Sequence, residues 1–425
     1  MPIDELNVRA LLARAEELIA EIEIKSRLEK ELSNVKSELN AARDIVTRLP
    51  IELSSDIFVR CLPASHPIPT PYDTPMLFLS VCRSWRTRAI STTELWTSIQ
   101  IEFPRAKNFE RVLDLWLRSA GNRKTSISLR GPLGPAVGVV LQQHAHLIQT
   151  LETHFSTAKM LPQLTAPFPS LRTLTIAQND RDFDRPDDFS RNPVPCVEIL
   201  KAAPALLECN FDGTYFRGEN EIHTPVTHLS LQILRLGWKR NENSAEILGY
   251  LTLPALQTLY IADFDIEPDI FFDFLRRSAP ALRSLSISTD VGWEIMRECF
   301  QLLPGLTAVD LAFEEDFSFL EELRSPGFLP SLRHLTIRRL NPDRSCYETL
   351  ISMLSTRRAS RPSQIQSFQL FSWGSPRNRL DPDIVASLRQ LVTDGLIIHV
   401  ASGVFFFPGR CILIHFLHSS LIWML

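Results

Sequence analysis

One short apolar pattern recurs along much of the chain and constrains its fold more than any other feature. Each copy has an apolar residue, two residues of any kind, a second apolar residue, one residue of any kind, and a third apolar residue. Copies begin at Leu171, Leu206, Leu231, Leu256, Leu282, Leu306, Leu332 and Ile365, after a degenerate first copy at Ile148. Successive copies start 23, 35, 25, 25, 26, 24, 26 and 33 residues apart. A period this even is typical of a solenoid, in which each repeat adds one structural unit.

The period near 25 residues and its signature resemble leucine-rich repeats, although the Asn or Cys that usually follows the strand is missing. The segments between copies, such as residues 270–278 and 293–303, are predicted to be helical, whereas residues 357–361 and 376–382 are predicted to be loops. One strand and one helix per repeat predict a right-handed α/β solenoid over residues 108–395, with a parallel sheet on its concave side. A generic α/β domain is the alternative, and the even spacing argues against it.

The alternation of side chains along a strand predicts what this solenoid displays. The apolar positions of each copy point inward, so the residue between the last two points out onto the concave sheet. This concave row reads Thr175, Asn210, Arg235, Tyr260, Ser286, Asp310, Thr336 and Gln369. We expect a target protein to bind its middle members, Arg235, Tyr260, Ser286, Asp310 and Thr336, since Tyr and Arg often anchor interfaces. The alternative is a solvated sheet face without a partner.

A long helix is predicted at the start of the chain, over residues 3–47. Residues 3–49 contain no Gly or Pro and are rich in strong helix formers. Their apolar residues step by four and three, as in the seam of a coiled coil: Leu28, Leu32, Val35, Leu39, Ala42, Val46 and Leu49. An earlier seam from Leu11 to Ile22 has the same steps, and the register slips between the two. We expect a parallel or antiparallel coiled coil that pairs two copies of the chain; the alternative is an amphipathic helix packed on its own chain.

Residues 48–99 form a second region, with two helical segments around a proline-rich loop. A Leu-Pro-x-Glu-Leu motif begins at Leu49 and leads into an apolar stripe that predicts a helix over residues 51–62. Five prolines between residues 63 and 75 exclude a helix or a central strand there. A Leu-x-Val-Cys-Arg-x-Trp-Arg motif follows from Leu79 within a predicted helix over residues 76–90, and a Leu-Trp pair at Leu95 closes the region.

These motifs resemble the F-box motif at both ends, with a longer loop between the helices than many F-boxes have. The resemblance implies a small all-α module that docks on the Skp-type adaptor of a cullin–RING (SCF) ubiquitin ligase. It implies that Leu49 and Pro50 are the entry pair pressed onto the adaptor. The other matching residues are at apolar adaptor-facing and core positions: Leu53, Ile57, Phe58, Leu62, Val81, Cys82 and Trp85. All nine are therefore expected to be adaptor-binding residues. A module of this size buries little surface alone, so we expect a partner to cover its apolar stripe. The alternative is a plain helical linker domain.

Composition and missing motifs exclude several classes of function. A net charge of −4 argues against a bulk affinity for nucleic acid or anionic membranes. The seven cysteines are scattered without a C-x-x-C pair, which favours free thiols over disulfides or a zinc site. We find no nucleophile motif and no phosphate loop, and His144 and His146 lack carboxylates at ligand spacing. We therefore expect no cofactor, no metal and no catalytic site, so the protein is not expected to be an enzyme.

Residues 396–425 form a hydrophobic tail. Pro408, Gly409 and Arg410 split its apolar run, and the piece beyond them is shorter than the ~20 residues that a membrane span needs. We therefore expect a buried strand or solenoid cap, and a membrane tail anchor is the alternative. Acidic residues from Asp4 onward do not fit a signal peptide, so a cytoplasmic or nuclear location is expected.

Together these expectations describe an α + α/β protein with a coiled-coil helix, an F-box module, an irregular leucine-rich-repeat solenoid and a tail. The functional hypothesis is a non-catalytic substrate receptor. Its F-box docks on the Skp-type adaptor and thereby joins the cullin, and its solenoid holds an unidentified target protein for ubiquitination. The alternative is a coiled-coil and solenoid scaffold that binds the adaptor without directing degradation.

Overall fold

Two compact units make up the part of the chain that the structure describes. The computed structural model describes residues 5–43, 45–102, 109–131, 135–155, 167–178, 196–212, 226–237, 246–264, 267–289, 293–312, 318–340, 342–360, 365–372 and 381–402. The first unit contains Met1–Ile101 and Arg111–Thr125, and the second contains Glu102–Glu110 and Ser126–Leu425. Within the described ranges, no helix combines the length and the apolar character that crossing a membrane requires.

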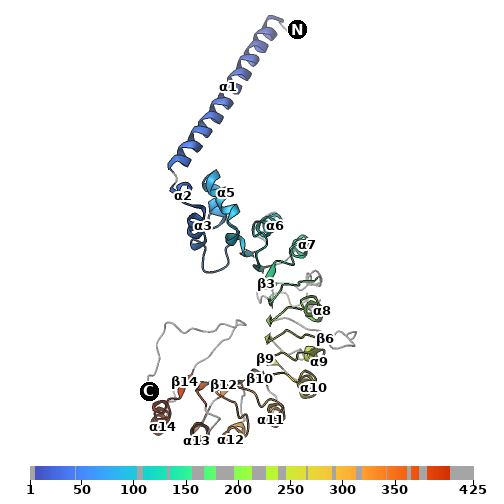
Figure 1. Ribbon diagram of the computed structural model, residues 1–425, viewed down its shortest axis with the longest axis vertical. Coiled ribbons are helices and arrows are strands. Elements are labelled where there is room, and N and C mark those ends of the chain that lie inside the picture. The colour runs from blue at the N-terminus through green and yellow to red at the C-terminus, as the bar shows by residue number, and fades with distance from the viewer. Residues whose placement is uncertain are drawn as a thin grey trace. The chain divides into compact units, whose positions relative to one another are not determined.

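The first unit is helical apart from one short strand (Figure 1). Its elements are α1 (Glu5–Arg43), α2 (Ile45–Arg48), α3 (Ile51–Arg60), α4 (Met76–Val81), α5 (Arg83–Ser91), the 3-10 helix η1 (Thr93–Trp96), β1 (Ser98–Glu102) and α6 (Phe109–Ser119). The helix predicted over residues 3–47 is thus present as α1 and α2. Pro50 is the N-cap residue of α3, a position where its missing N–H group breaks no helical hydrogen bond.

The prediction of one helix over residues 76–90 is wrong at its centre, because the chain breaks into α4 and α5 at Cys82. Cys82 has an extended backbone, with φ −159° and ψ 173°. Arg86 stabilises this break from both sides. Its side-chain Nε donates a hydrogen bond to the carbonyl of Leu79 at 2.8 Å, and its backbone N–H donates to the carbonyl of Cys82 at 3.0 Å. The carbonyl groups around the break are therefore satisfied without a continuous helix.

An aromatic cluster joins α3, α4 and α5. Phe58 of α3 stacks on Phe78 of α4 with ring centroids 4.3 Å apart, and Trp85 of α5 lies 5.1 Å from Phe58 and 5.8 Å from Phe78. A second aromatic contact follows, in which Trp96 of η1 packs edge-on against Trp116 of α6 at 4.9 Å. Large rings bury the most apolar surface per residue, so a small helical unit gains its core from few side chains.

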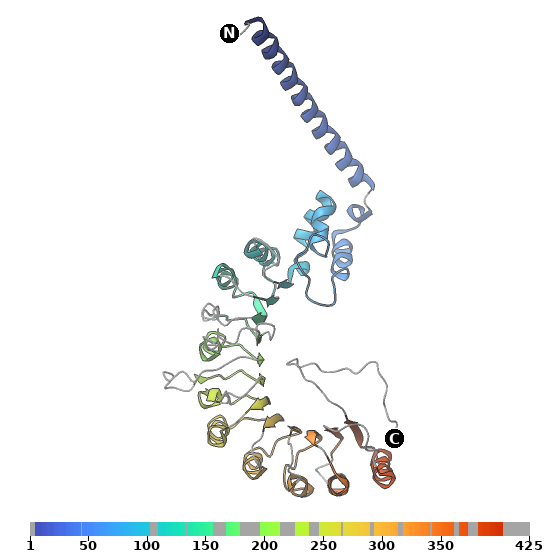
Figure 2. The same ribbon diagram turned by 180° about the vertical axis from the view of Figure 1, so that it is seen from behind.

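The second unit is a curved solenoid with its strands on the concave side and its helices on the convex side (Figure 1 and Figure 2). Its strands pair in one sheet in the order β2 (Thr125–Arg130), β3 (Ile148–Phe155), β4 (Thr173–Gln178), β5 (Glu208–Asp212), β7 (Ile233–Gly237), β9 (Thr258–Phe264), β10 (Ser284–Thr289), β11 (Ala308–Ala312), β12 (His334–Leu340), β13 (Ser367–Ser372) and β14 (Ile397–Ser402). The pairings from β3 to β14 are all parallel. The predicted parallel sheet is confirmed.

Helices connect successive strands, as one strand and one helix per repeat require. They are α7 (Pro135–Gln143), α8 (Cys196–Ala202), α9 (Glu246–Gly249), α10 (Pro268–Ser278), α11 (Trp293–Gln301), α12 (Ser318–Arg324), α13 (Arg344–Ala359) and α14 (Pro382–Thr393). Two short strands, β6 (Val226–Thr227) and β8 (Leu251–Thr252), form a separate parallel pair. The loop predicted over residues 357–361 is wrong at its start, because α13 continues to Ala359. Most of the second predicted loop, residues 376–380, lies outside the described residues.

The apolar positions of the repeats form the core. In every copy from Leu171 to Leu370, the three pattern residues are at most 2% exposed. The degenerate copy at Ile148 is also a repeat strand, because Ile148, Leu151 and Thr153 are buried in the same way. The hydroxyl of Thr153 donates a hydrogen bond to the carbonyl of Thr175 at 3.2 Å, which satisfies the polar residue in this core position.

The solenoid extends past the boundary predicted at residue 395. β14 pairs with β13 residue by residue, from Ser367 opposite Ile397 to Ser372 opposite Ser402. Gly395, with φ 90°, makes the turn from α14 into this strand, and Leu396 is buried. The start of the predicted tail is therefore the last described strand of the sheet. The rest of that tail, residues 403–425, lies outside the described residues.

Candidate functional site

Two helices of the first unit expose aliphatic side chains that the unit itself leaves uncovered. Leu53 and Ile57 are one turn apart on α3, and Leu77 and Val81 are one turn apart on α4. These four side chains are between 39% and 54% exposed. Ile51 and Ile90 are exposed to a similar extent. Aliphatic pairs that lie in solvent on short helices are suited to contact an apolar partner surface.

The aromatic cluster holds these exposed pairs in place. Phe58 follows Ile57 on α3 and Phe78 follows Leu77 on α4, so the stacked rings fix the rotation of both helices. Phe58 is only 1% exposed, which corrects its assignment as an adaptor-binding residue. Its physical role is to fill the core, because a side chain without accessible surface cannot contact a partner directly.

The other residues predicted to bind the adaptor lie between these extremes. Pro50 is exposed, and Leu49, Leu62, Cys82 and Trp85 are half-buried. Trp85 contributes one face to the aromatic cluster. Of the predicted residues, Leu53 and Ile57 on α3 and Val81 on α4 are therefore the accessible apolar ones. Phe58 and Trp85 belong to the aromatic cluster that packs these helices together.

A polar tie between α5 and the start of α3 was not predicted. Arg88 donates hydrogen bonds to the carbonyl of Leu49 at 3.1 Å and to the hydroxyl of Ser54, which is completely buried. The hydroxyls of Ser55 and Thr92 share another hydrogen bond at 2.8 Å. No local pattern in the sequence identifies this partner of Arg88, which lies 39 residues away. The consequence is that Leu49 is anchored to the helical module and not to α1.

Strand register aligns the predicted concave row in the second unit. Parallel pairing sets Thr175 opposite Asn210, Asn210 opposite Arg235, and so on through Tyr260, Ser286, Asp310, Thr336 and Gln369. The same register adds Glu152 before Thr175 and His399 after Gln369. Arg235, Tyr260, Ser286, Asp310 and Thr336 are all half-buried. The row thus crosses the concave face as one line of mostly polar side chains.

Ion pairs between neighbouring strands engage Arg235 and Asp310, two charged members of this row. Arg235 pairs with Glu208, and Asp310 pairs with Arg338. Burial raises the pKa of Asp310, and the charge of Arg338 acts in the opposite direction. Arg235 is therefore not a free anchor, which corrects the basis on which it was selected. Between these two ion pairs, the row presents the ring of Tyr260 and the hydroxyl of Ser286 to a partner. The charges of Arg235 and Asp310 are already balanced within the sheet.

A second polar cluster lies nearer the start of the sheet. His154 and Glu152 of β3 form a hydrogen-bonded pair at 2.5 Å, and this bond holds the pKa of Glu152 below its ordinary value. Asp212, at the end of β5, behaves in the opposite way, because burial raises its pKa to about 6 and His154 lowers it only in part. The described residues contain no group of three or more His, Cys, Asp or Glu side chains that could hold a metal ion.

Comparisons with known proteins find partial likeness to this chain in a curated relative and in a solved structure. No protein-family model matches the chain. The chain is 33% identical over 92 residues to the acidic leucine-rich nuclear phosphoprotein 32-related protein 1 of Caenorhabditis elegans. The match covers 21% of this chain and 40% of that relative, so the chain spans less than half of the relative's length.

A crystal structure of a Bacteroides fragilis protein aligns with 72% of this chain and 74% of its own, at 12% identity and a TM-score of 0.37. A score below 0.5 does not establish a shared fold, so this likeness supports no conclusion here. The parallel strand-and-helix repeats, their buried apolar signature and the leucine-rich relative agree with one another. The second unit has a fold of the leucine-rich-repeat type.

Proposed function

We propose that this protein is the non-catalytic substrate receptor of an SCF-type ubiquitin ligase. In this proposal the α3–α5 module is an F-box that docks on the Skp-type adaptor, and the adaptor connects it to the cullin. The solenoid holds a target protein. The observation that carries the proposal is the set of exposed aliphatic pairs, Leu53 with Ile57 and Leu77 with Val81, on helices that also carry the F-box-like motifs.

The physical support comes from the different positions of the aromatic and the aliphatic residues within this module. Its rings are buried in the α3–α5 cluster, whereas its branched aliphatic residues remain in solvent. Transfer of apolar surface out of water is the main favourable term in association, so four such side chains favour a helical partner with an apolar groove. The Arg88 and Thr92 hydrogen bonds make the presenting surface rigid before binding, which reduces the entropy lost on docking.

The solenoid supports the second half of the proposal, the binding of a target protein. The leucine-rich relative indicates a role in protein interaction at this coarser level. A receptor of this kind needs no catalytic group, because holding a target near the ligase raises its effective concentration at the transferring subunit. We expect the receptor in the cytoplasm or the nucleus, and the name of the nematode relative describes a nuclear phosphoprotein.

Adaptor binding tests this proposal directly. We expect the purified full chain to bind a purified Skp-type adaptor in isothermal titration calorimetry. Leu53→Asp and Val81→Asp should each weaken this binding at least about tenfold, because each places a charge in the apolar contact. Leu302→Asp is the matched control, since Leu302 is a similarly exposed leucine of the second unit, and it should bind as wild type does. Circular dichroism of each variant verifies that the fold is intact.

Two outcomes distinguish the substrate receptor from the alternative functions. If the wild-type chain fails to bind the adaptor, or if both aspartate variants bind it as tightly as wild type, the F-box proposal fails. If the adaptor binds but cullin does not co-purify with the complex from cells, the protein is a scaffold that uses the adaptor without directing ubiquitination.

A further inference from the structure

We infer that α1 pairs with α1 of a second copy as a parallel, in-register coiled coil, through the seam of Leu28, Leu32, Val35 and Leu39. This inference is independent of the proposed ligase function. It concerns α1, whose apolar side chains stay in solvent over many turns. The partner is a second copy of this chain because the charges beside the seam complement those of an identical helix, as the following paragraphs argue.

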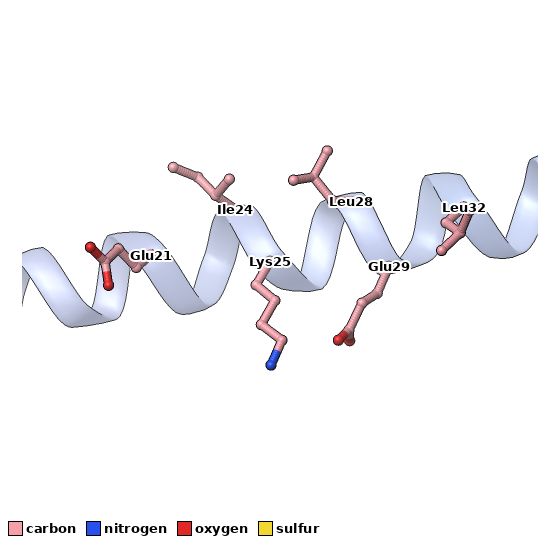
Figure 3. A pocket seen from close by; sticks show the side chains of 6 residues that line it. All are labelled: Glu21, Ile24, Lys25, Leu28, Glu29 and Leu32. Carbon is pink, nitrogen blue, oxygen red and sulfur yellow. The ribbon is translucent and has the colours of Figure 1, made fainter.

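The seam is an apolar stripe of α1, a helix that also exposes apolar side chains nearer its N-terminus, such as Leu12, Leu18 and Ile22. The four residues of the seam are between 48% and 60% exposed. Figure 3 shows the start of the stripe, where Ile24 and Leu28 point to one side of the helix and Lys25 and Glu29 point to the other. Leu32 follows one turn after Leu28, and the residues labelled in Figure 3 line a shallow groove. A stripe of this kind is buried in soluble proteins by another helix or by the protein's own core.

The heptad register follows from the spacing of the seam. Leu32 and Leu39 occupy position a, and Leu28 and Val35 occupy position d, since the step from d to the next a is four residues and from a to d is three. The residues beside the seam then fall at positions g and e. Glu31 and Glu38 precede the a residues and take position g, whereas Glu29 and Lys36 follow the d residues and take position e.

These flanking charges select the parallel arrangement. In a parallel pair, each g residue faces the e residue five positions later on the other helix. Glu31 of one copy therefore faces Lys36 of the second copy, and the reciprocal pair forms by symmetry. The same offset relates Glu38 to Arg43 in the sequence. Glu31 and Lys36 are both exposed in the single chain, so their side chains are accessible to a second helix.

The antiparallel arrangement creates repulsion instead. In that geometry g residues face g residues on one side of the pair, so Glu31 of one copy meets Glu38 of the second copy and the carboxylates repel each other. On the other side e residues face e residues, so Glu29 meets Lys36 and this attraction only offsets the repulsion. The parallel pair has the attractive contact at Glu31–Lys36, and by sequence spacing that at Glu38–Arg43, without this repulsion, and it is therefore favoured. Within one chain, Glu31 also lies 3.5 Å from Arg27, but both side chains are largely exposed and this contact is weak. It does not compete strongly with a pair between two helices.

The seam ends within α1, which limits the strength of the association. Val46 and Leu49 continue the spacing in the sequence, but they lie after Arg43 and are half-buried in the first unit. Toward the N-terminus, the register slips between Ile22 and Leu28. Because few heptads remain, we expect a reversible dimer whose population depends on protein concentration. A parallel pair brings residue 43 of both copies to the same end.

Cross-linking of the full chain tests orientation and register together. In a Cys61→Ser background, which removes an exposed thiol, Leu28→Cys should form a disulfide-linked dimer on oxidation because the two copies of position 28 face each other. Ser33→Cys is the matched control at an outward heptad position and should remain monomeric. In an antiparallel pair, residue 28 would lie opposite residue 39, roughly 16 Å along the helix, so only a mixture of Leu28→Cys and Leu39→Cys chains would cross-link.

Charge exchange tests the recognition itself by sedimentation equilibrium, in which the monomer has a mass of 48.4 kDa. Glu31→Lys and Lys36→Glu should each weaken dimerisation about tenfold, since each sets like charges opposite one another twice. The double variant should restore it. A wild-type chain that stays monomeric at tens of micromolar, or a double variant as weak as the single variants, overturns the inference. Adaptor binding is not measured here, so this failure is distinct from failure of the proposed function.

Discussion

One fully buried charged residue of the solenoid, Arg357, is held by backbone carbonyl groups. Arg357 of α13 is completely buried, and it donates hydrogen bonds to the carbonyls of Leu323, Phe328 and Leu329, the last at 2.9 Å. Burial lowers its pKa to about 10. Leu329 has a positive φ of 49°, so the guanidinium stabilises a turn that leaves carbonyl groups without helical partners.

We expect Arg357→Met to lower the free energy of unfolding by about 3–5 kcal/mol, because three buried carbonyls lose their donors. Urea denaturation followed by circular dichroism measures this change. Arg324→Met is the control, since Arg324 is exposed and has only a long contact of 3.9 Å with Glu321. An equal effect of the two substitutions would contradict the role assigned to Arg357.

Asp212 provides a prediction about pH. Its folded-state pKa is raised from the ordinary 3.8 to about 6, so the folded protein binds this proton more tightly than the unfolded chain does. Its charge therefore destabilises the fold above pH 6, and this penalty disappears below about pH 4. A displacement of this size corresponds to about 3 kcal/mol, and partial exposure of the carboxylate reduces it to about 1–2 kcal/mol.

We therefore expect Asp212→Asn to be more stable than wild type at pH 7.5 and equally stable at pH 4. Thermal unfolding of both proteins at pH 7.5 and at pH 4 measures this difference in stability. The comparison at pH 4 is the internal control. A stability gain that is the same at both values would arise from packing and would disprove the electrostatic explanation.

The C-terminal end of α10 requires a left-handed backbone conformation that its residue type does not favour. α10 ends at Ala279, which has a left-handed backbone with φ 39° and ψ 51° and donates its N–H to the carbonyl of Leu275 at 2.8 Å. Glycine is the usual residue at such a cap because a Cβ atom is strained there. The repeat tolerates alanine because packing of the buried face of α10, which includes Phe271 and Phe274, fixes the helix end.

Ala279→Gly should stabilise the protein by about 0.5–1 kcal/mol, because relief of strain at positive φ exceeds the added chain entropy. Ala386→Gly is the opposite control: Ala386 is exposed in the middle of α14, and glycine there should cost about 1 kcal/mol. Chemical denaturation of both variants provides the comparison. A loss of stability at both positions would mean that the cap at Ala279 is not strained.

At the scale of the whole molecule, the solenoid is a linear array whose last described member is β14. In such arrays each unit contacts only its neighbours, so removing an end member uncovers the edge of the next strand. Here that edge belongs to β13, and the loss also removes the buried Leu396. The hydrophobic segment from residue 396 is thus partly structural.

A chain that ends at Gly395 should therefore unfold at a temperature several degrees lower than a chain that ends at Ser402, since burial of one leucine contributes about 1.5–3 kcal/mol. It should also aggregate more through the exposed strand edge. Differential scanning calorimetry and size-exclusion chromatography of the two chains measure these effects. Equal melting temperatures would show that the boundary predicted at residue 395 is correct after all.

Local sequence patterns were sufficient to predict most of the helices and strands. The apolar triads from Leu171 to Leu370 identified the strands, their inward faces and the members of the concave row, because alternation and period depend on neighbouring residues. The same local rules failed at Cys82, where the helical pattern continued but the chain breaks, and at Arg357, where a basic run suggested a loop. At Cys82 the break is stabilised by the nearby Arg86, whereas the partners of Arg357 lie 28 to 34 positions away.

The candidate site divides in the same way. The sequence identified the apolar residues of α3 and α4, but it could not separate Phe58, which is buried, from Leu53, Ile57 and Val81, which are exposed. Which apolar residues of a stripe face the core depends on how α3, α4 and α5 rotate around their rings. Likewise, the sequence predicted Arg235 as an anchor, and only the adjacent strand revealed that Glu208 already engages it.

By itself, the sequence determined a long N-terminal helix, a small helical region and a repeat solenoid with a polar concave row, because each follows from periodicity within short segments. The tertiary structure alone decided which side chains remain accessible for a partner and which charges are already paired. It also decided that residues 397–402 belong to the sheet. These properties depend on contacts between residues 25 to 40 positions apart, and hydrogen bonds and burial at that distance leave no periodic trace in the chain.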